Sequence, residues 1–192
     1  LLYDKGVKKS LVQFNDGMSP MELRAMVLTL MRKLKQICNA PAQYAKDGSY
    51  ASAEYSGKMH RLFGILEDLE AAGRKVLIFT QFREMGKLLQ KLIGEKTGST
   101  PKFIHGGVAQ KERQAIVDSF QTNRSDKVLI LSLKAAGTGL NLTAATAIIH
   151  YDLWWNPAVE NQATDRAYRI GQKSSVNVYR FISAETFEEK IN

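Results

Sequence analysis

The sharpest chemical signal in this sequence is a pair of arginines near its C-terminal end. In the segment NQATDRAYRIGQ (161–172), Gln162, Arg166 and Arg169 fall at i, i+4 and i+7, which places them on one face of a helix. A guanidinium stays charged, and its planar fork can bind two phosphate oxygens at once. The same spacing also fits an exposed helix on which Asp165 pairs with Arg169, so the neighbouring segments decide between these interpretations.

Three polar loops follow short apolar runs and could bind an anion. They begin at Gln81, at His105 and at Ser132, and each offers backbone amides, hydroxyl groups or cations. The glycine pair 106–107, taken alone, is better explained by a tight turn. The loop around 137–139 is more specific, because two strong apolar runs flank it and it carries lysine, threonine and asparagine side chains.

Two adjacent tryptophans, Trp154 and Trp155, lie between an apolar run and the Asn-Pro pair at 156–157. Adjacent residues cannot share one face, so we expect one indole in the core and the other toward the polar loops. An exposed aromatic side chain can stack on nucleic acid or wedge against it. The second tryptophan is therefore a candidate nucleic-acid contact.

A sheet must position these loops, and the apolar runs predict one. Five short runs alternate with helical patterns, which is typical of a parallel sheet that helices cover on both faces. The predicted strands are 75–80, 103–104, 128–132, 147–151 and 176–182, and the helices between them include 110–120 and 157 to about 170. The carboxyl ends of parallel strands meet at one edge, so we expect the polar loops to share a site there.

A separate helical pattern precedes these runs. The capping box SPME (19–22), with proline at the first helical position, predicts a helix over 20–39. The following polar and glycine-containing stretch, 42–57, indicates an exposed connection. We therefore predict a helical extension and linker over 1–56 and the main domain over 57–192.

Composition and charge limit the classes of protein that fit. The chain has 192 residues, enough for one domain with an extension, and no apolar run long enough to cross a membrane. Lys and Arg outnumber Asp and Glu by 27 to 19. The net charge of +8 suits a polyanionic partner such as nucleic acid, although a solvated basic surface fits equally well.

Cysteine and histidine usage argues against metal and disulfide chemistry. The single cysteine, Cys38, excludes an internal disulfide and indicates a reducing compartment, and its helical spacing with Leu34 and Ile37 predicts a buried, unreactive thiol. The three histidines show no metal-ligand spacing. The first residues lack a signal-peptide pattern and an initiator Met, so we expect both ends to be cuts within a longer protein.

Taken together, the motifs closely resemble the C-terminal helicase lobe of Swi/Snf-type DNA-dependent ATPases. The resemblance covers about 57–192, and its blocks are KVLIFTQF, FIHGGVAQKERQAIVDSF, LILSLKAAGTGLNLTAATAIIHYDLWWNPAVENQATDRAYRIGQ and FISAETFEEKI. RIGQ and WNP are specific to that family among superfamily-two helicases, and the double tryptophan looks most like prokaryotic and recombination-associated members. The resemblance implies an α/β fold, a RecA-like open parallel β-sheet with helices on both faces, here with an N-terminal helical extension.

The resemblance also implies roles for individual residues. Arg166 and Arg169 match the arginines that reach across a lobe interface to the triphosphate, while Gln162, Gly137 and Gly139 match nucleotide-binding positions. The candidate DNA contacts are Gln81, His105, Gly106, Gly107, Ser132, Lys134, Asn141, Thr143 and Trp155. The chain departs from the common family form with Ala136 where Gly is frequent and with lysine at 134 where many members have arginine, a change that can cost a bidentate contact.

One half of an ATP site is missing from the sequence. No G-x-x-x-x-G-K-[ST] loop occurs, since 94–97 (GEKT) lacks the first glycine and follows a helix, and no acidic magnesium-binding box is present. We therefore expect ATP with Mg²⁺ to be bound mainly by the N-terminal RecA-like lobe of the same full-length protein, and the isolated chain to be inactive. The implied function is the second motor lobe of an ATP-dependent double-stranded DNA translocase or remodeller.

The expected partners are double-stranded DNA and that first lobe, with a DNA-bound protein target as a further candidate and no membrane. The expected location is the cytoplasm, with the nucleoid, in a prokaryote, or the nucleus in a eukaryote. Two alternatives share the basic surface: the second lobe of an RNA helicase and a non-catalytic nucleic-acid-binding module. RIGQ and WNP argue against the first, and the intact arginines against the second. A nucleotide-binding oxidoreductase is disfavoured because no G-x-G-x-x-G opens a helix after a first strand.

Overall fold

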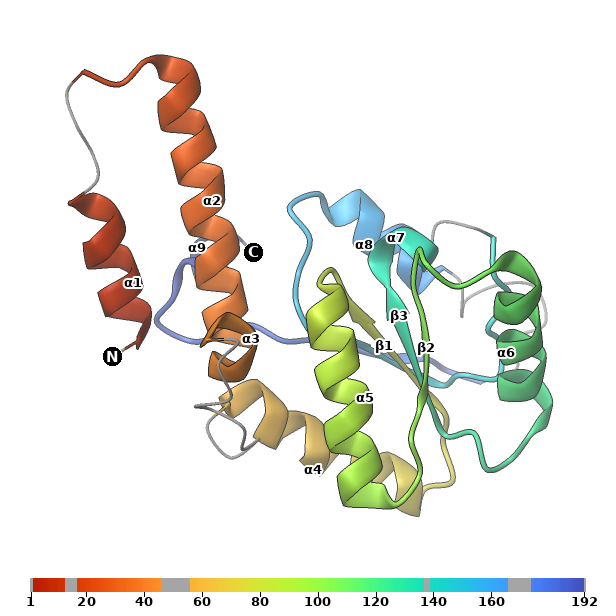
Figure 1. Cartoon of the computed structure of the whole chain (residues 1–192). Coiled ribbons are helices and arrows are strands. Elements are labelled where there is room, and N and C mark those ends of the chain that lie inside the picture. The colour runs from red at the N-terminus through yellow and green to blue at the C-terminus, as the bar shows by residue number, and fades with distance from the viewer. Residues whose placement is uncertain (1, 13–16, 46–55, 137–138, 166–173, 192) are drawn as a thin grey trace.

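Short apolar runs form the five strands of a parallel sheet, as the sequence predicts. The computed structural model of the chain describes residues 2–12, 17–45, 56–136, 139–165 and 174–191. The strands are β1 (Val76–Thr80), β2 (Lys102–Ile104), β3 (Val128–Ser132), β4 (Ala147–His150) and β5 (Asn177–Arg180). They pair in the order β2-β3-β1-β4-β5, and every pair is parallel (Figure 1). The arrangement confirms the predicted RecA-like α/β class.

Helices cover both faces of this sheet. Helices α4 (Gly57–Ala71) and α5 (Arg83–Thr97) pack on one face, while α6 (Gln110–Thr122), α7 (Leu133–Ala136) and α8 (Pro157–Thr164) contribute to the core of the other. Successive side chains of a strand point to opposite faces, so β1 gives Val76 and Ile78 to the first core and Leu77 and Phe79 to the second. All five residues of β1 are buried because it lies in the middle of the sheet.

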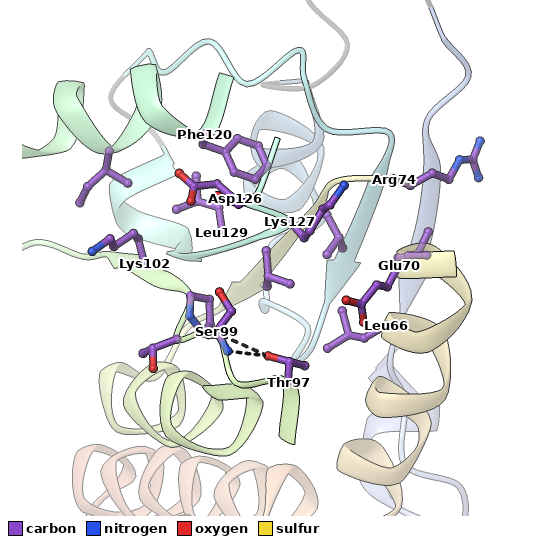
Figure 2. Close-up of a pocket in the computed structure, with 17 residues that line it drawn as sticks. Leu66, Glu70, Arg74, Thr97, Ser99, Lys102, Phe120, Asp126, Lys127 and Leu129 are labelled. Atoms are coloured by element: carbon purple, nitrogen blue, oxygen red, sulfur yellow. Dashed lines mark hydrogen bonds between the residues drawn. The ribbon is translucent and has the colours of Figure 1, made fainter. Parts of the chain in front are cut away.

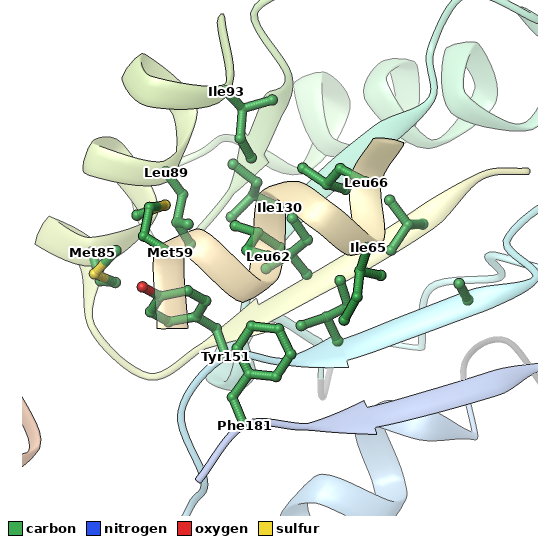
Figure 3. Close-up of a cluster of buried hydrophobic side chains, with 14 of the residues drawn as sticks. Met59, Leu62, Ile65, Leu66, Met85, Leu89, Ile93, Ile130, Tyr151 and Phe181 are labelled. Atoms are coloured by element: carbon green, nitrogen blue, oxygen red, sulfur yellow. The ribbon is translucent and has the colours of Figure 1, made fainter. Parts of the chain in front are cut away.

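The core on the first face fixes the helix that follows β1. Met59 and Leu62 of α4, Met85 and Leu89 of α5, and Ile130 of β3 are fully buried together (Figure 3). Deleting large side chains from such a core typically costs about 2–5 kcal/mol. The start of α5, and with it the short loop that leaves β1, is therefore held rigidly.

The N-terminal extension is a pair of helices that projects from the sheet domain. Helices α1 (Leu2–Leu11) and α2 (Pro20–Asn39) lie side by side (Figure 1). The predicted capping box is present, because the Glu22 amide donates to Ser19 Oγ at 3.3 Å and the Ser19 amide donates to Glu22 Oε2 at 2.8 Å. The predicted bounds of this helix are confirmed.

The connection after α2 differs from the prediction. Pro41 ends α2 but also begins a short helix, α3 (Pro41–Ala45), in which the side chain of Gln43 is buried and accepts a hydrogen bond from Asn39 Nδ2 at 3.2 Å. Proline suits the first position of a helix as well as the position that stops one, and the sequence does not distinguish the two uses. The prediction of an exposed connection is therefore wrong for residues 42–44, and 46–55 lie outside the described residues.

The last turns of α2 are fastened to the sheet domain by buried polar contacts. The Asn39 carbonyl accepts hydrogen bonds from Tyr151 Oη at 2.8 Å and from Ser56 Oγ at 2.7 Å. Nearby, Lys58 of α4 forms a buried ion pair of 2.8 Å with Glu188 of α9 (Phe187–Ile191). The division of the chain at 56/57 stays a prediction, but this end of α2 packs as part of the domain.

Other boundaries differ by small amounts. Strand β5 is shorter than predicted, spanning Asn177–Arg180, and α7 was not predicted at all. Helix α8 is described to Thr164, and the continuation predicted to about residue 170 lies outside the described residues. Among the helices that the structure describes, none is both long enough and apolar enough to span a bilayer.

Candidate nucleotide and nucleic-acid interface

A buried carboxylate, Asp152, organises the carboxyl edge of β1 and β4. Its Oδ1 accepts from the Gln81 amide at 2.8 Å, and its Oδ2 accepts from Thr80 Oγ1 at 2.5 Å and from Asn39 Nδ2 at 3.0 Å. Burial raises the pKa of Asp152, and the hydrogen bonds from Thr80 and Gln81 oppose that rise. The donors come from two segments, the end of β1 and the end of α2, and Asp152 itself follows β4, so this carboxylate holds three parts of the chain together.

Asp152 and Asn39 were not predicted to organise this edge. The available signal was a carboxylate directly after a strongly apolar run, which is where a buried charge needs several donors. Gln81, predicted to contact DNA, lies beside this carboxylate, and its Nε2 donates to the Leu153 carbonyl at 3.1 Å. The side-chain nitrogen of Gln81 is thus engaged in positioning the segment that leads to the tryptophans.

The loop after β2 is a closed turn inside a cationic cluster. Arg113 of α6 donates to the carbonyls of His105 at 3.3 Å, Gly106 at 3.2 Å and Val108 at 2.8 Å, and the Gly107 amide donates to His105 Nδ1 at 3.0 Å. A Cβ at position 107 would lie 3.1 Å from the His105 ring, so a larger residue there would have to push the ring aside. The glycine pair 106–107 therefore forms a tight turn, as its sequence taken alone predicts.

The charge around this turn favours an anion. Burial lowers the pKa of His105, and the nearby cations Arg83, Lys87 and Arg113 lower it further, which keeps the imidazole neutral at pH 7. Gly106 and Gly107 are exposed, so their backbone faces solvent beside these cations. Arg113 was not predicted to lie here, because nothing in the sequence of a helix shows which loop its cations approach.

Two of the predicted contacts after β3 serve mainly to build the loop. Ser132 is buried, and its Oγ accepts from the Ala135 amide at 3.3 Å at the start of α7. Thr143 Oγ1 accepts from Gln121 Nε2 at 3.2 Å, and the oxygen of the same Gln121 side chain accepts from the Ala144 amide at 2.8 Å. These hydroxyl groups are engaged within the chain, so their predicted contacts with DNA remain predictions.

Three other predicted positions of this loop are exposed. Lys134, Gly139 and Asn141 all face solvent. Gly139 has φ = +78°, a left-handed conformation that strongly favours glycine. Gly137 lies outside the described residues. The loop therefore presents a cation and an amide side chain at the carboxyl edge.

Helix α8 precedes the two predicted arginine fingers in the sequence and is anchored at both ends. Asn156 Oδ1 accepts from the Ala158 amide at 3.0 Å, and Thr164 Oγ1 is 2.9 Å from Nε2 of the buried His150. Gln162 is exposed on this helix. Helices α7 and α8 lie side by side (Figure 1). Arg166 and Arg169 lie outside the described residues, so the structure does not test their predicted role.

A second buried carboxylate fixes the first turn of α8. Glu160 accepts from the Trp154 amide at 2.5 Å and from Arg180 Nη2 of β5 at 2.9 Å. Glu160 is 3% exposed although it carries a charge, which a carboxylate tolerates only when it is paired. The turn between β4 and α8 is thereby tied to the neighbouring strand.

The two tryptophans divide as predicted. Trp154 packs against the core of the second face, whereas Trp155 is 38% exposed. The indole of Trp155 stacks on Phe187 with ring centroids 6.2 Å apart, and Lys35 Nζ lies 4.2 Å from the indole centroid. Trp155 is therefore the indole available at the surface.

A separate cavity lies at the opposite edge of the sheet. It has a volume of about 110 Å³, and its walls come from the amino ends of β1, β2 and β3 and from α4 and α6 (Figure 2). Leu66 and Phe120 are among its apolar walls, and Arg74, Lys102 and Lys127 among its charged ones. Of the predicted site residues that the structure describes, none lines this cavity, since the loops that carry them leave the carboxyl ends of the strands.

Within the described ranges, no group of three or more His, Cys, Asp or Glu side chains could hold a metal ion. The placement of Mg²⁺ ligands on another lobe stays a prediction. Cys38 is half buried, and burial raises the pKa of its thiol, which disfavours the reactive thiolate.

A parallel sheet with basic, glycine-containing loops at its carboxyl edge defines a RecA-like helicase lobe. Residues 57–171 match the helicase conserved C-terminal domain, and the chain belongs to that family. More closely, it belongs with the C-terminal domains of SWI2/SNF2-type ATPases.

Relatives and solved structures support this assignment. The chain is 44% identical over 192 residues to the putative ATP-dependent helicase/translocase YwqA of Bacillus subtilis, covering all of this chain but 21% of that protein. It is similar to the Sulfolobus solfataricus SWI2/SNF2 ATPase core in complex with dsDNA, with a TM-score of 0.87, 41% identity and coverage of 99% of this chain and 39% of that one. The SWI2/SNF2 ATPase C-terminal domain of the same organism gives a TM-score of 0.83 at 38% identity, covering 99% and 76%.

Proposed function

We propose that this chain is the second motor lobe of a double-stranded DNA translocase or remodeller, and that it completes an ATP site formed mainly by another lobe. The observation that carries the proposal is the shared edge of the sheet. Lys134, an exposed residue of α7, lies at that edge together with exposed Trp155 and the start of α8, and Arg166 and Arg169 follow α8 in the sequence.

The proposed role of Arg166 and Arg169 is to reach the triphosphate when the two lobes close. Guanidinium groups suit this role because they stay charged and bind phosphate oxygens in pairs. The buried contacts of Glu160 and of Thr164 with His150 set the direction of α8 two residues before Arg166. When bound, ATP would supply the phosphoanhydride bond whose hydrolysis drives the motor, and the phosphate-binding loop and Mg²⁺ ligands are expected on the first lobe.

The proposed role of the loops is to grip the DNA backbone. The cationic turn at His105, the exposed Lys134 and the exposed indole of Trp155 offer charge and a stacking surface without a fixed pattern of base-specific donors. Binding should therefore tolerate any sequence and weaken steeply with salt. The similarity to an ATPase core solved with double-stranded DNA supports duplex DNA as the ligand.

A comparison of nucleic acids tests the proposal. The chain would be joined to the upstream lobe of its own full-length protein, and ATP hydrolysis measured without nucleic acid, with duplex DNA and with RNA. Strong stimulation by duplex DNA is expected. Stimulation by RNA alone would instead indicate an RNA helicase, and hydrolysis absent under all three conditions would indicate a non-catalytic binding module.

The chain alone should bind ATP weakly and should not hydrolyse it, because the phosphate-binding loop lies outside this sequence. Purified chain incubated with ATP, Mg²⁺ and duplex DNA is the measurement. Appreciable turnover that Arg166→Ala abolishes would contradict this expectation.

A further inference from the structure

A lysine of the helical extension lies beneath the exposed tryptophan. Lys35 belongs to the last turns of α2, yet its Nζ donates a hydrogen bond to the carbonyl of Leu153, 118 residues later in the chain. The same ammonium lies 4.2 Å from the centroid of the Trp155 indole, which is within the range of a cation–π interaction. One side chain thus contacts both the backbone and the ring of the 153–155 segment.

Burial of this ammonium needs an explanation. Lys35 is 3% exposed, and lysine is almost never fully buried without partners. Burial lowers the pKa of Lys35, and the neighbouring carboxylates of Asp152, Glu188 and Glu160 oppose that effect. An apolar side chain could fill the same space without the cost of desolvating a charge. An apolar side chain could not, however, attract the face of the Trp155 indole as the Lys35 ammonium does.

Packing alone does not fix the indole of Trp155. Trp155 is 38% exposed, and a cavity of about 140 Å³ lies beside its ring, with walls that include Leu153, Trp154 and Pro157. Its stacking partner, Phe187, belongs to the short helix α9, so it too comes from a distant part of the chain. A ring with open space next to it can tilt unless a directional contact holds it.

We propose that Lys35 is a positioning residue for Trp155, holding the indole outward at the DNA-facing edge through its ammonium. Helix α2 thereby becomes part of the DNA grip although it lies outside the matched helicase domain, which begins at Gly57. This inference rests on the proposed function, because it assigns to Trp155 a contact with duplex DNA.

The first test follows the ring itself and needs no DNA. In a Trp154→Phe background, Trp155 is the only tryptophan of the chain, so its emission spectrum and acrylamide quenching report its surroundings. Lys35→Met should change the emission and make quenching steeper, whereas Lys35→Arg, which keeps a cation, should preserve both. Lys33→Met is the matched control, since Lys33 is exposed on the same helix.

The second test measures the consequence for DNA. In the full-length protein, Lys35→Met should raise the duplex DNA concentration for half-maximal ATPase stimulation about five-fold or more, which corresponds to about 1 kcal/mol of lost binding free energy. The ATPase rate of Lys35→Met at saturating DNA should stay within about two-fold of the parental rate. A general loss of structure would instead lower this rate as well. Lys35→Arg should restore the half-maximal concentration.

Each outcome decides between positioning and a merely structural role. Unchanged Trp155 emission and quenching in Lys35→Met would overturn the proposal. If Lys35→Met does not fold, Lys35→Gln replaces it: an uncharged donor should keep the fold yet still lose the Trp155 signature, and parental behaviour in this variant would overturn the proposal. A changed signature in a protein that DNA does not stimulate would leave the positioning intact and contradict the proposed function instead.

Discussion

The side-chain amide of Asn39 donates a hydrogen bond of 3.0 Å to Asp152, a residue 113 positions later in the chain. The same carboxylate accepts from Thr80 and from the Gln81 amide, so one buried charge joins α2, β1 and β4 at the edge that carries the candidate site. Removal of that charge would leave three donors without their acceptor.

Asp152→Ala should destabilise the chain by about 3 kcal/mol or more, because each buried donor left unsatisfied costs about 1–3 kcal/mol. Urea unfolding of the 192-residue chain measures the loss. Asp68→Ala is the control, since Asp68 is exposed on α4. Equal stability of the two variants would show that Asp152 does not hold this edge.

The buried His150 should make stability depend on pH. Burial, with a contribution from Arg180, lowers the pKa of His150 to about 4, against an ordinary value of 6.5. Between these pH values the unfolded chain takes up a proton that the folded chain does not, so stability should fall as the pH drops from about 6.5 to about 4. The full effect is about 3 kcal/mol by the usual 1.36 kcal/mol per pH unit.

Replacement of this imidazole tests the pH effect. His150→Gln should flatten the dependence of unfolding free energy on pH over that window, whereas His60→Gln, at an exposed position on α4, should leave it as in the parent. A parental slope in His150→Gln would mean that other groups cause the dependence.

The ion pair of Glu160 and Arg180 should respond asymmetrically to substitution. Glu160 is buried while the Arg180 side chain is 43% exposed, so only the carboxylate depends on its partner for compensation. Arg180→Met should cost about 2 kcal/mol because it leaves a buried charge, and Glu160→Gln less than about 1 kcal/mol. The double variant should resemble Glu160→Gln alone, and strictly additive unfolding free energies would contradict this reading of the pair.

The two glycines after β2 should differ although they are neighbours. Gly107→Ala brings a Cβ within 3.1 Å of the His105 ring, whereas a Cβ at Gly106 meets nothing within 4 Å. Gly107→Ala should displace His105 and weaken duplex binding, and Gly106→Ala should change binding little. Fluorescence anisotropy with labelled duplex DNA measures the affinity of both variants. Equal affinities of Gly107→Ala and Gly106→Ala would show that this turn does not contact DNA.

Lys134 should contribute one phosphate contact. Lys134→Ala should lower the slope of log affinity against log salt by about 0.9, in line with one neutralised phosphate. Lys102→Ala serves as the control, because Lys102 is exposed at the opposite edge of the sheet. The measurement is a series of duplex DNA titrations of the full-length protein at different salt concentrations. An unchanged slope of log affinity against log salt in Lys134→Ala would show that Lys134 does not contact the DNA backbone.

The sequence predicts the sheet well because both of its faces are buried. Runs such as 76–80 and 128–132 must be apolar throughout, and that pattern is visible locally. The polar loops are predictable for the same reason, since they follow the runs directly. The capping box of α2 is equally local, and its predicted bounds agree with the structure.

The contacts that hold the site are not visible locally. Asn39 with Asp152 and Lys35 with Leu153 pair across more than a hundred residues, and nothing in either segment marks the partner. Ser132 and Thr143 look like phosphate contacts in the sequence, but their hydroxyl groups bond within the chain because the loop must satisfy its own backbone and side chains.

The central claim is that the arginines after α8 complete an ATP site on another lobe. The most direct measurement is the single-turnover rate of ATP hydrolysis by the full-length protein at saturating duplex DNA, with Arg166→Ala compared to Arg124→Ala, an exposed arginine in the loop before β3. Arginine fingers are typically worth about 10³–10⁵ in rate, so Arg166→Ala should lose about that much while Arg124→Ala keeps the parental rate. A parental rate in Arg166→Ala would contradict the account.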